Sequence, residues 1–169
     1  FEKGDLIEEI WADRFESLTR VSKRLSIFDR YSMNKTFSYN SGLSFLLKKL
    51  DGIANNIIVD IFTEKPANTL NMGRHFDSYK RFTESLTGGG INEISAYVMD
   101  DQDVSWRGRE RYLRFDSFLV DLGHGVELFE ADRNSGPEKK VDKQMSYTFH
   151  HNSDTHRTNE FEIKINSPY

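Results

Sequence analysis

The sequence predicts an α/β fold in which a mixed β-sheet is flanked by helices and the C-terminal part is rich in strands. Amphipathic helical patterns alternate with short apolar segments through the first hundred residues, and two-residue alternation dominates after them. No internal repeat or low-complexity linker divides the 169 residues, so we expect one domain over residues 1–169. Because the chain starts with Phe1 rather than Met, we expect it to belong to a longer parent protein with other domains.

Three stretches have apolar residues at the three- and four-residue spacing of an amphipathic helix. Their apolar positions are Leu6, Ile7, Ile10, Trp11, Phe15 and Leu18; Leu43, Leu46, Leu47 and Leu50; and Phe76, Tyr79, Phe82 and Leu86. We expect the first helix to begin at Asp5 and the second to stop at Asp51-Gly52. The third is closed by Gly88-Gly89-Gly90, where we expect a loop hinge because no Lys-Ser/Thr follows as in a phosphate-binding loop.

The other apolar segments predict strands. Residues 57–62 are rich in β-branched side chains and almost continuously apolar, which is typical of a strand buried on both faces. The remaining predicted strands are 24–31, 94–99, 112–115, 118–122, 147–149 and 161–165. Residues 126–129 form a further short apolar piece, and residues 133–143 a charged loop with Pro and Gly.

Composition narrows the possible functions. The net charge of -4 argues against a dedicated, non-specific nucleic-acid coat. The absence of Cys excludes disulfides and thiol catalysis and fits a reducing compartment. No apolar run approaches the ~18 residues of a membrane-spanning helix. We therefore expect a cytoplasmic protein, with peripheral attachment to a membrane left open.

The charge is unevenly distributed, because four arginines lie within eight residues. They are Arg107, Arg109, Arg111 and Arg114. If a strand begins there, Arg109 and Arg111 share a face and can bind one phosphate with two guanidinium groups. Trp106 as a stacking platform and His124 in a Gly-rich turn complete the predicted ligand-binding set. The alternative is a set of internal or surface ion pairs with nearby acids.

The same segment resembles a known family. The spacing Arg109-x-Arg111-x4-Asp116, followed by an apolar strand and a Gly-rich turn, is similar to the His-x-Lys-x4-Asp signature of phospholipase D. Residues 109–116 and 122–129 resemble the phospholipase D-like C-terminal domain of MIT (microtubule-interacting and trafficking) proteins. The resemblance implies a single phospholipase D-like domain that binds an anionic phospholipid headgroup at a membrane surface and forms a homodimer across the motif face.

The departures from the family pattern bear on catalysis. Position 109 is Arg where the phospholipase D nucleophile is His. A guanidinium has a pKa above ~12 and stays protonated, so it cannot be that nucleophile. Only one copy of the motif is present, so an active site would need a dimer. Asp116 is retained and is predicted to pair with Arg109, Arg111 or Arg114. We therefore expect a non-catalytic, phosphate-recognising pseudoenzyme without a cofactor, or alternatively a domain that binds the phosphodiester backbone of a nucleic acid.

His124 and a C-terminal cluster of histidines leave other chemistry open. His124, with Asp116, is the fallback for a catalytic site of the phosphodiesterase type. The fallback metal ligands are His150, His151, Asp154 and His156. A polar hairpin turn is the simpler interpretation of this second group.

Overall fold

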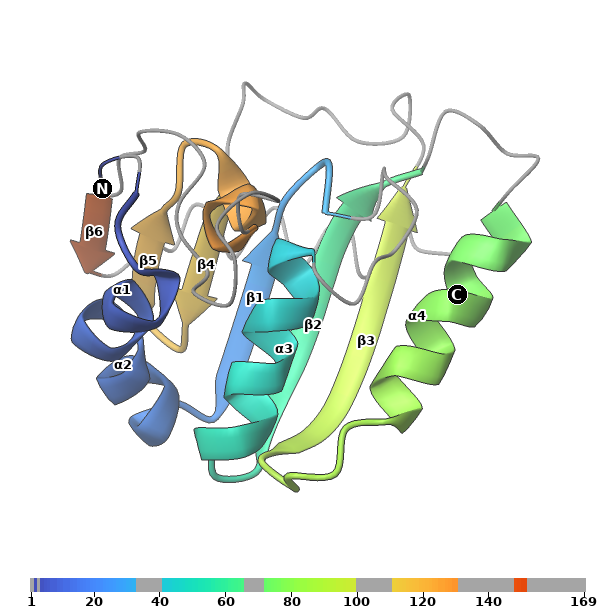
Figure 1. Cartoon of the computed structure of the whole chain (residues 1–169), viewed down its shortest axis with the longest axis horizontal. Helices are drawn as coiled ribbons and strands as arrows, with labels where there is room; N and C mark the ends of the chain where they lie inside the picture. The colour runs from blue at the N-terminus through green and yellow to red at the C-terminus, as the bar shows by residue number, and fades with distance from the viewer. Residues whose placement is uncertain are drawn as a thin grey trace.

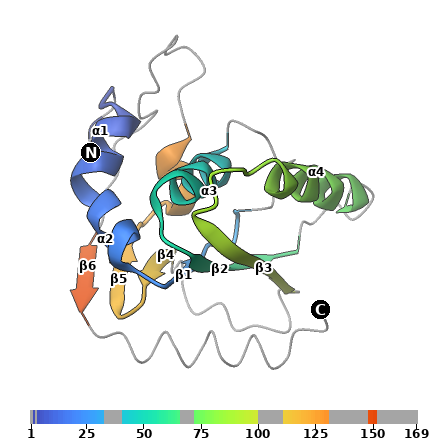
Figure 2. The same ribbon diagram turned by 90° about the horizontal axis from the view of Figure 1, so that it is seen from below.

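The computed structural model contains a six-stranded mixed β-sheet with the described helices on one face (Figures 1 and 2). It describes residue 2 and residues 4–32, 41–65, 72–99, 111–130 and 148–151. The helices are α1 (Ile7–Arg14), α2 (Glu16–Val21), α3 (Gly42–Ile53), α4 (Met72–Glu84) and the 3-10 helix η2 (Gly125–Phe129). The strands are β1 (Arg24–Phe28), β2 (Ile57–Glu64), β3 (Ile91–Met99), β4 (Tyr112–Phe115), β5 (Phe118–Asp121) and β6 (Thr148–His151). The predicted α/β fold with a mixed sheet is confirmed.

The strand order is β3-β2-β1-β4-β5-β6. Strands β1, β2 and β3 are parallel, whereas β4 is antiparallel to β1 and each later strand is antiparallel to the one before it. From β1 the chain therefore proceeds outward to β3 and then returns to the other side of β1. In open α/β sheets, ligands bind outside the carboxyl ends of the strands at such a switch point. The switch point here lies between β1 and β4.

Most predicted elements correspond to observed ones, and the differences have local causes. The first predicted helix is two helices that meet at Phe15. The φ of Phe15 is -117°, which departs from the value of an α-helix, and its ring is buried against Trp11 with centroids 5.7 Å apart. The predicted stop at Asp51-Gly52 is wrong, since α3 continues to Ile53. The apolar piece at 126–129 is part of η2. The predicted loop at 133–143 and strand at 161–165 lie outside the described residues.

The main hydrophobic core lies between the helices and the sheet. Within it, an aromatic cluster joins α1, α3 and η2, with ring centroids 5.4 to 6.2 Å apart; its members are Trp11, Phe15, Phe45 and Phe129. Gly42 lets α3 approach η2 closely, because a Cβ there would overlap the backbone carbonyl of Val126. This packing fixes η2 beside the carboxyl end of β1. No described helix has the length and apolar character needed to cross a bilayer.

The opposite face of the sheet carries a smaller buried cluster made of strand residues: Phe28, Phe62, Met99, Tyr112 and Leu119. Beside this cluster runs a polar row in which Ser26 of β1 is in register with Arg114 on one side and Asp60 on the other. Arg114 is buried and donates from Nη2 to the Ser26 hydroxyl at 2.9 Å, while Asp60 forms an ion pair with Arg24. Charged groups are thus kept on this face by their partners.

Asp116 occupies the turn between β4 and β5, at the amino end of β1. Its carboxylate accepts hydrogen bonds from the backbone N–H groups of Lys23 at 3.1 Å and Arg24 at 3.0 Å. Its backbone φ is 49°, in the left-handed region that Asp and Asn tolerate better than other non-glycine residues. Asp116 therefore connects the turn to the start of the central strand.

We predict that Asp116→Ala lowers the free energy of unfolding by about 1–3 kcal/mol, because two backbone donors lose their acceptor and Ala is disfavoured at positive φ. Asp116→Asn is the matched control, since it keeps one acceptor oxygen and tolerates the same conformation. Urea unfolding measures both. Equal losses in the two variants would contradict this role of the carboxylate.

Candidate functional site

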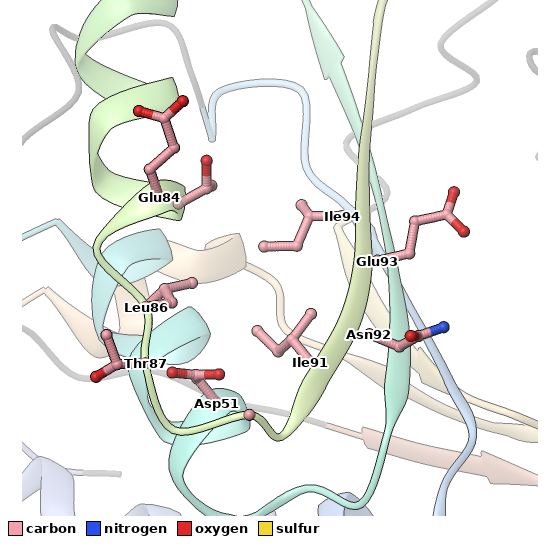
Figure 3. A pocket seen from close by; sticks show the side chains of 10 residues that line it. Asp51, Glu84, Leu86, Thr87, Ile91, Asn92, Glu93 and Ile94 are labelled. Atoms are coloured by element: carbon pink, nitrogen blue, oxygen red, sulfur yellow. The ribbon is translucent and has the colours of Figure 1, made fainter.

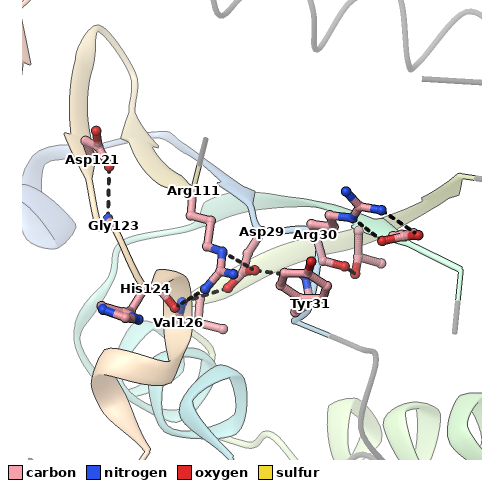
Figure 4. Close-up of polar contacts among 10 residues, drawn as sticks. Asp29, Arg30, Tyr31, Arg111, Asp121, Gly123, His124 and Val126 are labelled. Carbon is pink, nitrogen blue, oxygen red and sulfur yellow. Dashed lines mark hydrogen bonds and ion pairs between the residues drawn. The ribbon is translucent and has the colours of Figure 1, made fainter. Parts of the chain in front are cut away.

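The candidate site lies at the switch point, on the carboxyl edge of the sheet (Figure 4). Asp29 follows the last residue of β1, and Arg111 precedes the first residue of β4. The turn after β5 closes the site, with Gly123 and Gly125 both at positive φ, 49° and 68°. Because β4 is antiparallel to β1, the start of one and the end of the other meet at this edge.

Asp29 is the most buried charged group of the site, with 2% of its surface exposed. Its Oδ1 accepts from the N–H of Tyr31 at 2.9 Å, and its Oδ2 accepts from the N–H of Val126 at 2.8 Å. Burial raises the pKa of this carboxyl above its ordinary value. The two amide hydrogen bonds and the charge of Arg111 oppose that rise, and Glu127 adds to it.

Arg111 is held on three sides. Its Nε lies 4.0 Å from Oδ1 of Asp29, and its Nη1 donates to the backbone carbonyl of His124 at 2.9 Å. Its guanidinium carbon lies 4.7 Å from the centroid of the Tyr31 ring, a cation–π contact. Among the described residues Nη2 has no hydrogen-bond partner, and 14% of the side chain is exposed. The guanidinium is therefore held in one orientation, while Nη2 keeps its capacity to donate a hydrogen bond.

The ring of Tyr31 contacts two guanidinium groups, because Arg30 also lies over it at 5.6 Å. Arg30 forms an ion pair with Glu64 at the end of β2. Arg30 and Arg111 pair with the carboxylates of Glu64 and Asp29, and the charge of Glu127 also acts on Asp29. The described residues of this edge therefore carry no excess of positive charge.

Gly125 is required by the geometry of the site. A Cβ at this position would overlap the carboxylate of Asp29 and would lie 2.9 Å from Cδ of Arg111. Only glycine lets the turn place the N–H of Val126 against the buried carboxylate at this φ.

The structure separates several residues that the sequence analysis grouped. Arg114 is not a ligand-binding residue of this site, because it is buried on the polar row and bonded to Ser26 and to the Asp116 carbonyl. Asp116 does not pair with Arg111, since the four residues of β4 span roughly 13 Å between them. Asp116 and His124 likewise flank opposite ends of β5, so they do not form a common catalytic pair.

The other predicted site residues are only partly described. His124 contributes its carbonyl, and Figure 4 shows its ring on the side away from Arg111. His150 and His151 belong to β6, opposite Leu119 and Phe118 of β5. No three His, Asp or Glu residues within the described ranges are grouped to hold a metal ion. Trp106, Arg107, Arg109, Asp154 and His156 lie outside the described residues.

The glycine run before β3 is also not a hinge. Gly88 and Gly90 donate their N–H groups to the side chain and the backbone carbonyl of Asp51, at 2.6 and 2.9 Å. A Cβ on either glycine would overlap the backbone at the end of α3. Close packing accounts for these two residues.

Sequence reasoning missed Asp29, Tyr31 and Gly125. An acid directly after an apolar strand was the available signal for Asp29, since carboxyl ends of parallel strands form binding edges. Neither a scan of family models nor a search of curated proteins finds a match to this chain. The site is therefore argued from its own geometry.

We predict that Gly125→Ala destabilises the protein by more than the ~1–2 kcal/mol cost of a left-handed Ala, because its methyl group overlaps the Asp29 carboxylate. Gly89→Ala is the matched control, with a similar φ of 73° and no atom within 4 Å of the new Cβ. Thermal unfolding compares the two variants. A loss no greater than that of Gly89→Ala would show that the contact with Asp29 does not restrict this turn.

We predict that the Asp29 carboxyl lowers stability as pH rises. Its pKa in the folded state is above the ordinary value of 3.8, so the folded protein holds the proton more tightly than the unfolded chain. The stability of wild type relative to Asp29→Asn should therefore fall as pH rises above 3.8 and level off once the folded carboxyl is ionised. Urea midpoints of both proteins across this pH range test it. A wild type that becomes more stable relative to Asp29→Asn as pH rises would contradict it.

Proposed function

We propose that this domain binds a phosphate group without catalysing a reaction on it, with Arg111 as the fixed donor. The observation that carries the proposal is the state of this guanidinium. Asp29, Tyr31 and the His124 carbonyl orient it, while Nη2 remains unpaired among the described residues. An oriented guanidinium loses little entropy on binding and matches the geometry of phosphate oxygens.

Neighbouring charge and location support the same function. The switch point of an open α/β sheet is the usual place for a ligand. Arg109 is joined to Arg111 through one residue, and two peptide units span at most about 7 Å. Arg107 and Arg109 precede Arg111 in the sequence and add two positive charges to this segment of the chain.

The absence of catalysis is proposed from the chemistry of the residue types. Arg109 stands where the resembled signature has a nucleophilic His, and a permanently protonated guanidinium cannot attack phosphorus. Arg111 in place of the signature Lys keeps a positive charge. The orientation of the His124 ring, away from Arg111, gives the proposed phosphate no imidazole from this turn.

An anionic phospholipid headgroup is the proposed source of the phosphate, in keeping with the resemblance to the phospholipase D-like domain of MIT proteins. Homodimerisation across the motif face belongs to the same proposal. With a net charge of -4, the domain should bind acidic membranes weakly and with strong dependence on salt. A nucleic-acid backbone offers the same phosphate chemistry and is the second arm of the test.

We predict that Arg111→Gln weakens binding to phosphatidylserine-containing vesicles by about tenfold at low salt, because one charge-assisted donor is lost. Arg20→Gln is the control, since it removes the same charge from α2, where Arg20 pairs with Glu16 at 2.6 Å. Vesicle flotation measures the first arm, and titration of single-stranded DNA measures the second.

Loss of vesicle binding in Arg111→Gln alone supports the lipid source. Loss of DNA binding with no vesicle binding in any variant assigns the phosphate to a nucleic acid. If wild type binds neither probe, or both variants bind equally, Arg111 is not a phosphate donor and the proposal is wrong. Thermal unfolding of both variants establishes that each is folded.

A further inference from the structure

Strand β3 is an edge of the sheet, and among the described residues no strand pairs with its outer side. It is nine residues long and contains no Pro or Lys, the residues that commonly protect exposed edges. The carbonyl of Met99 accepts from the N–H of Lys65 after β2, so the backbone of Met99 faces β2. Alternation then directs the backbone N–H and C=O groups of Ile94, Ala96 and Val98 away from β2.

A pocket of about 480 Å³ lies next to this edge, between the end of α4 and the start of β3 (Figure 3). Leu86, Ile91 and Ile94 provide its apolar lining, and Figure 3 shows Ile91 and Ile94 on the side of β3 that faces Leu86. The loop at its base is held by the hydrogen bonds from Gly88 and Gly90 to Asp51. The pocket is therefore formed before any ligand arrives.

The exposed backbone of β3 and the pocket are positioned so that one added strand could contact both. Ile94 has an outward-facing backbone and a side chain that lines the pocket. A strand added along this edge would direct every second side chain toward the same face as Ile94. Backbone pairing would supply affinity, and an apolar side chain in the pocket would supply specificity.

Acidic residues near the pocket indicate which kind of peptide strand would bind there. Its lining residues include Asp51 and Glu84 and no Lys, Arg or His. Figure 3 shows the Glu93 side chain on the opposite face of β3 from Ile94, the face toward which residues that flank an apolar residue of an added strand would point. The Nζ of Lys80 lies 4.0 Å from Oε1 of Glu84 in an ion pair exposed on both sides. Such a pair contributes little, so the pocket rim remains favourable to cations.

We propose that β3 and the pocket beside α4 bind an extended segment of a partner protein in which Lys or Arg flanks a large apolar residue. The segment adds a strand at the outer edge of β3 and places its apolar side chain against Leu86, Ile91 and Ile94. This interaction is independent of Arg111, which lies at the switch point on the other side of β2 and β1.

The test is selection of a random peptide library, displayed on phage, against the whole domain, followed by titration of the selected peptides. Peptides with Lys or Arg beside Leu, Ile or Phe should be enriched. Ala96→Pro should weaken their binding by about tenfold, because it removes an outward N–H without breaking the β2 ladder. Ala96→Ser keeps that N–H and is the control.

Charge reversal gives a second test that does not depend on the proline variant folding. The double variant Glu84→Lys/Glu93→Lys changes two exposed residues and should abolish the preference for basic peptides. Glu9→Lys, on the exposed side of α1, should not. Enrichment of peptides without basic residues, or unchanged affinity in both Ala96→Pro and the double variant, would overturn the proposal.

Discussion

The arrangement of the carboxyl edge depends on one buried carboxylate. Asp29 receives two backbone N–H groups, one from its own turn and one from η2, and it faces Arg111. A charge with so little contact with water is tolerated only because donors converge on it. The donor from η2 is in place because the aromatic cluster and Gly42 hold η2 against α3. Packing far from the site thus sets the position of the Arg111 guanidinium.

Arg111 and Arg114 are close in sequence but have different surroundings in the structure. Arg111 lies at the edge, against the turn and the ring of Tyr31, whereas Arg114 is buried on the polar row with Ser26. Both are arginines of one short segment, but a shift of three residues along a strand changes the face and moves the side chain toward the other edge. The segment therefore contains one arginine that contacts the turn at the carboxyl edge and one that stabilises pairing between β4 and β1.

This division explains which predictions held. Local patterns were sufficient to locate α3, α4 and all six observed strands, because periodicity reports burial of one face directly. They did not show the break at Phe15 or the 3-10 helix η2. The site was harder to predict, because motif spacing suggested that Asp116 lies near Arg111, whereas β4 places them at opposite edges. Asp29 escaped notice because its role depends on Val126, 97 residues further along the chain. No window of local sequence contains both.

Contacts between residues so far apart in sequence also affect the rate of folding. Ser26 and Arg114 are 88 residues apart, and Lys23 and Asp116 are 93 residues apart, so the contacts that join β1 to β4 close very long loops. Such contacts are costly in chain entropy and slow the folding of a domain. During synthesis, β1 and β2 leave the ribosome well before β4, and Asp29 stays hydrated until β4 and η2 arrive. The edge that carries Asp29 and Arg111 would then be among the last parts of the domain to form, and a ligand there would select fully folded molecules.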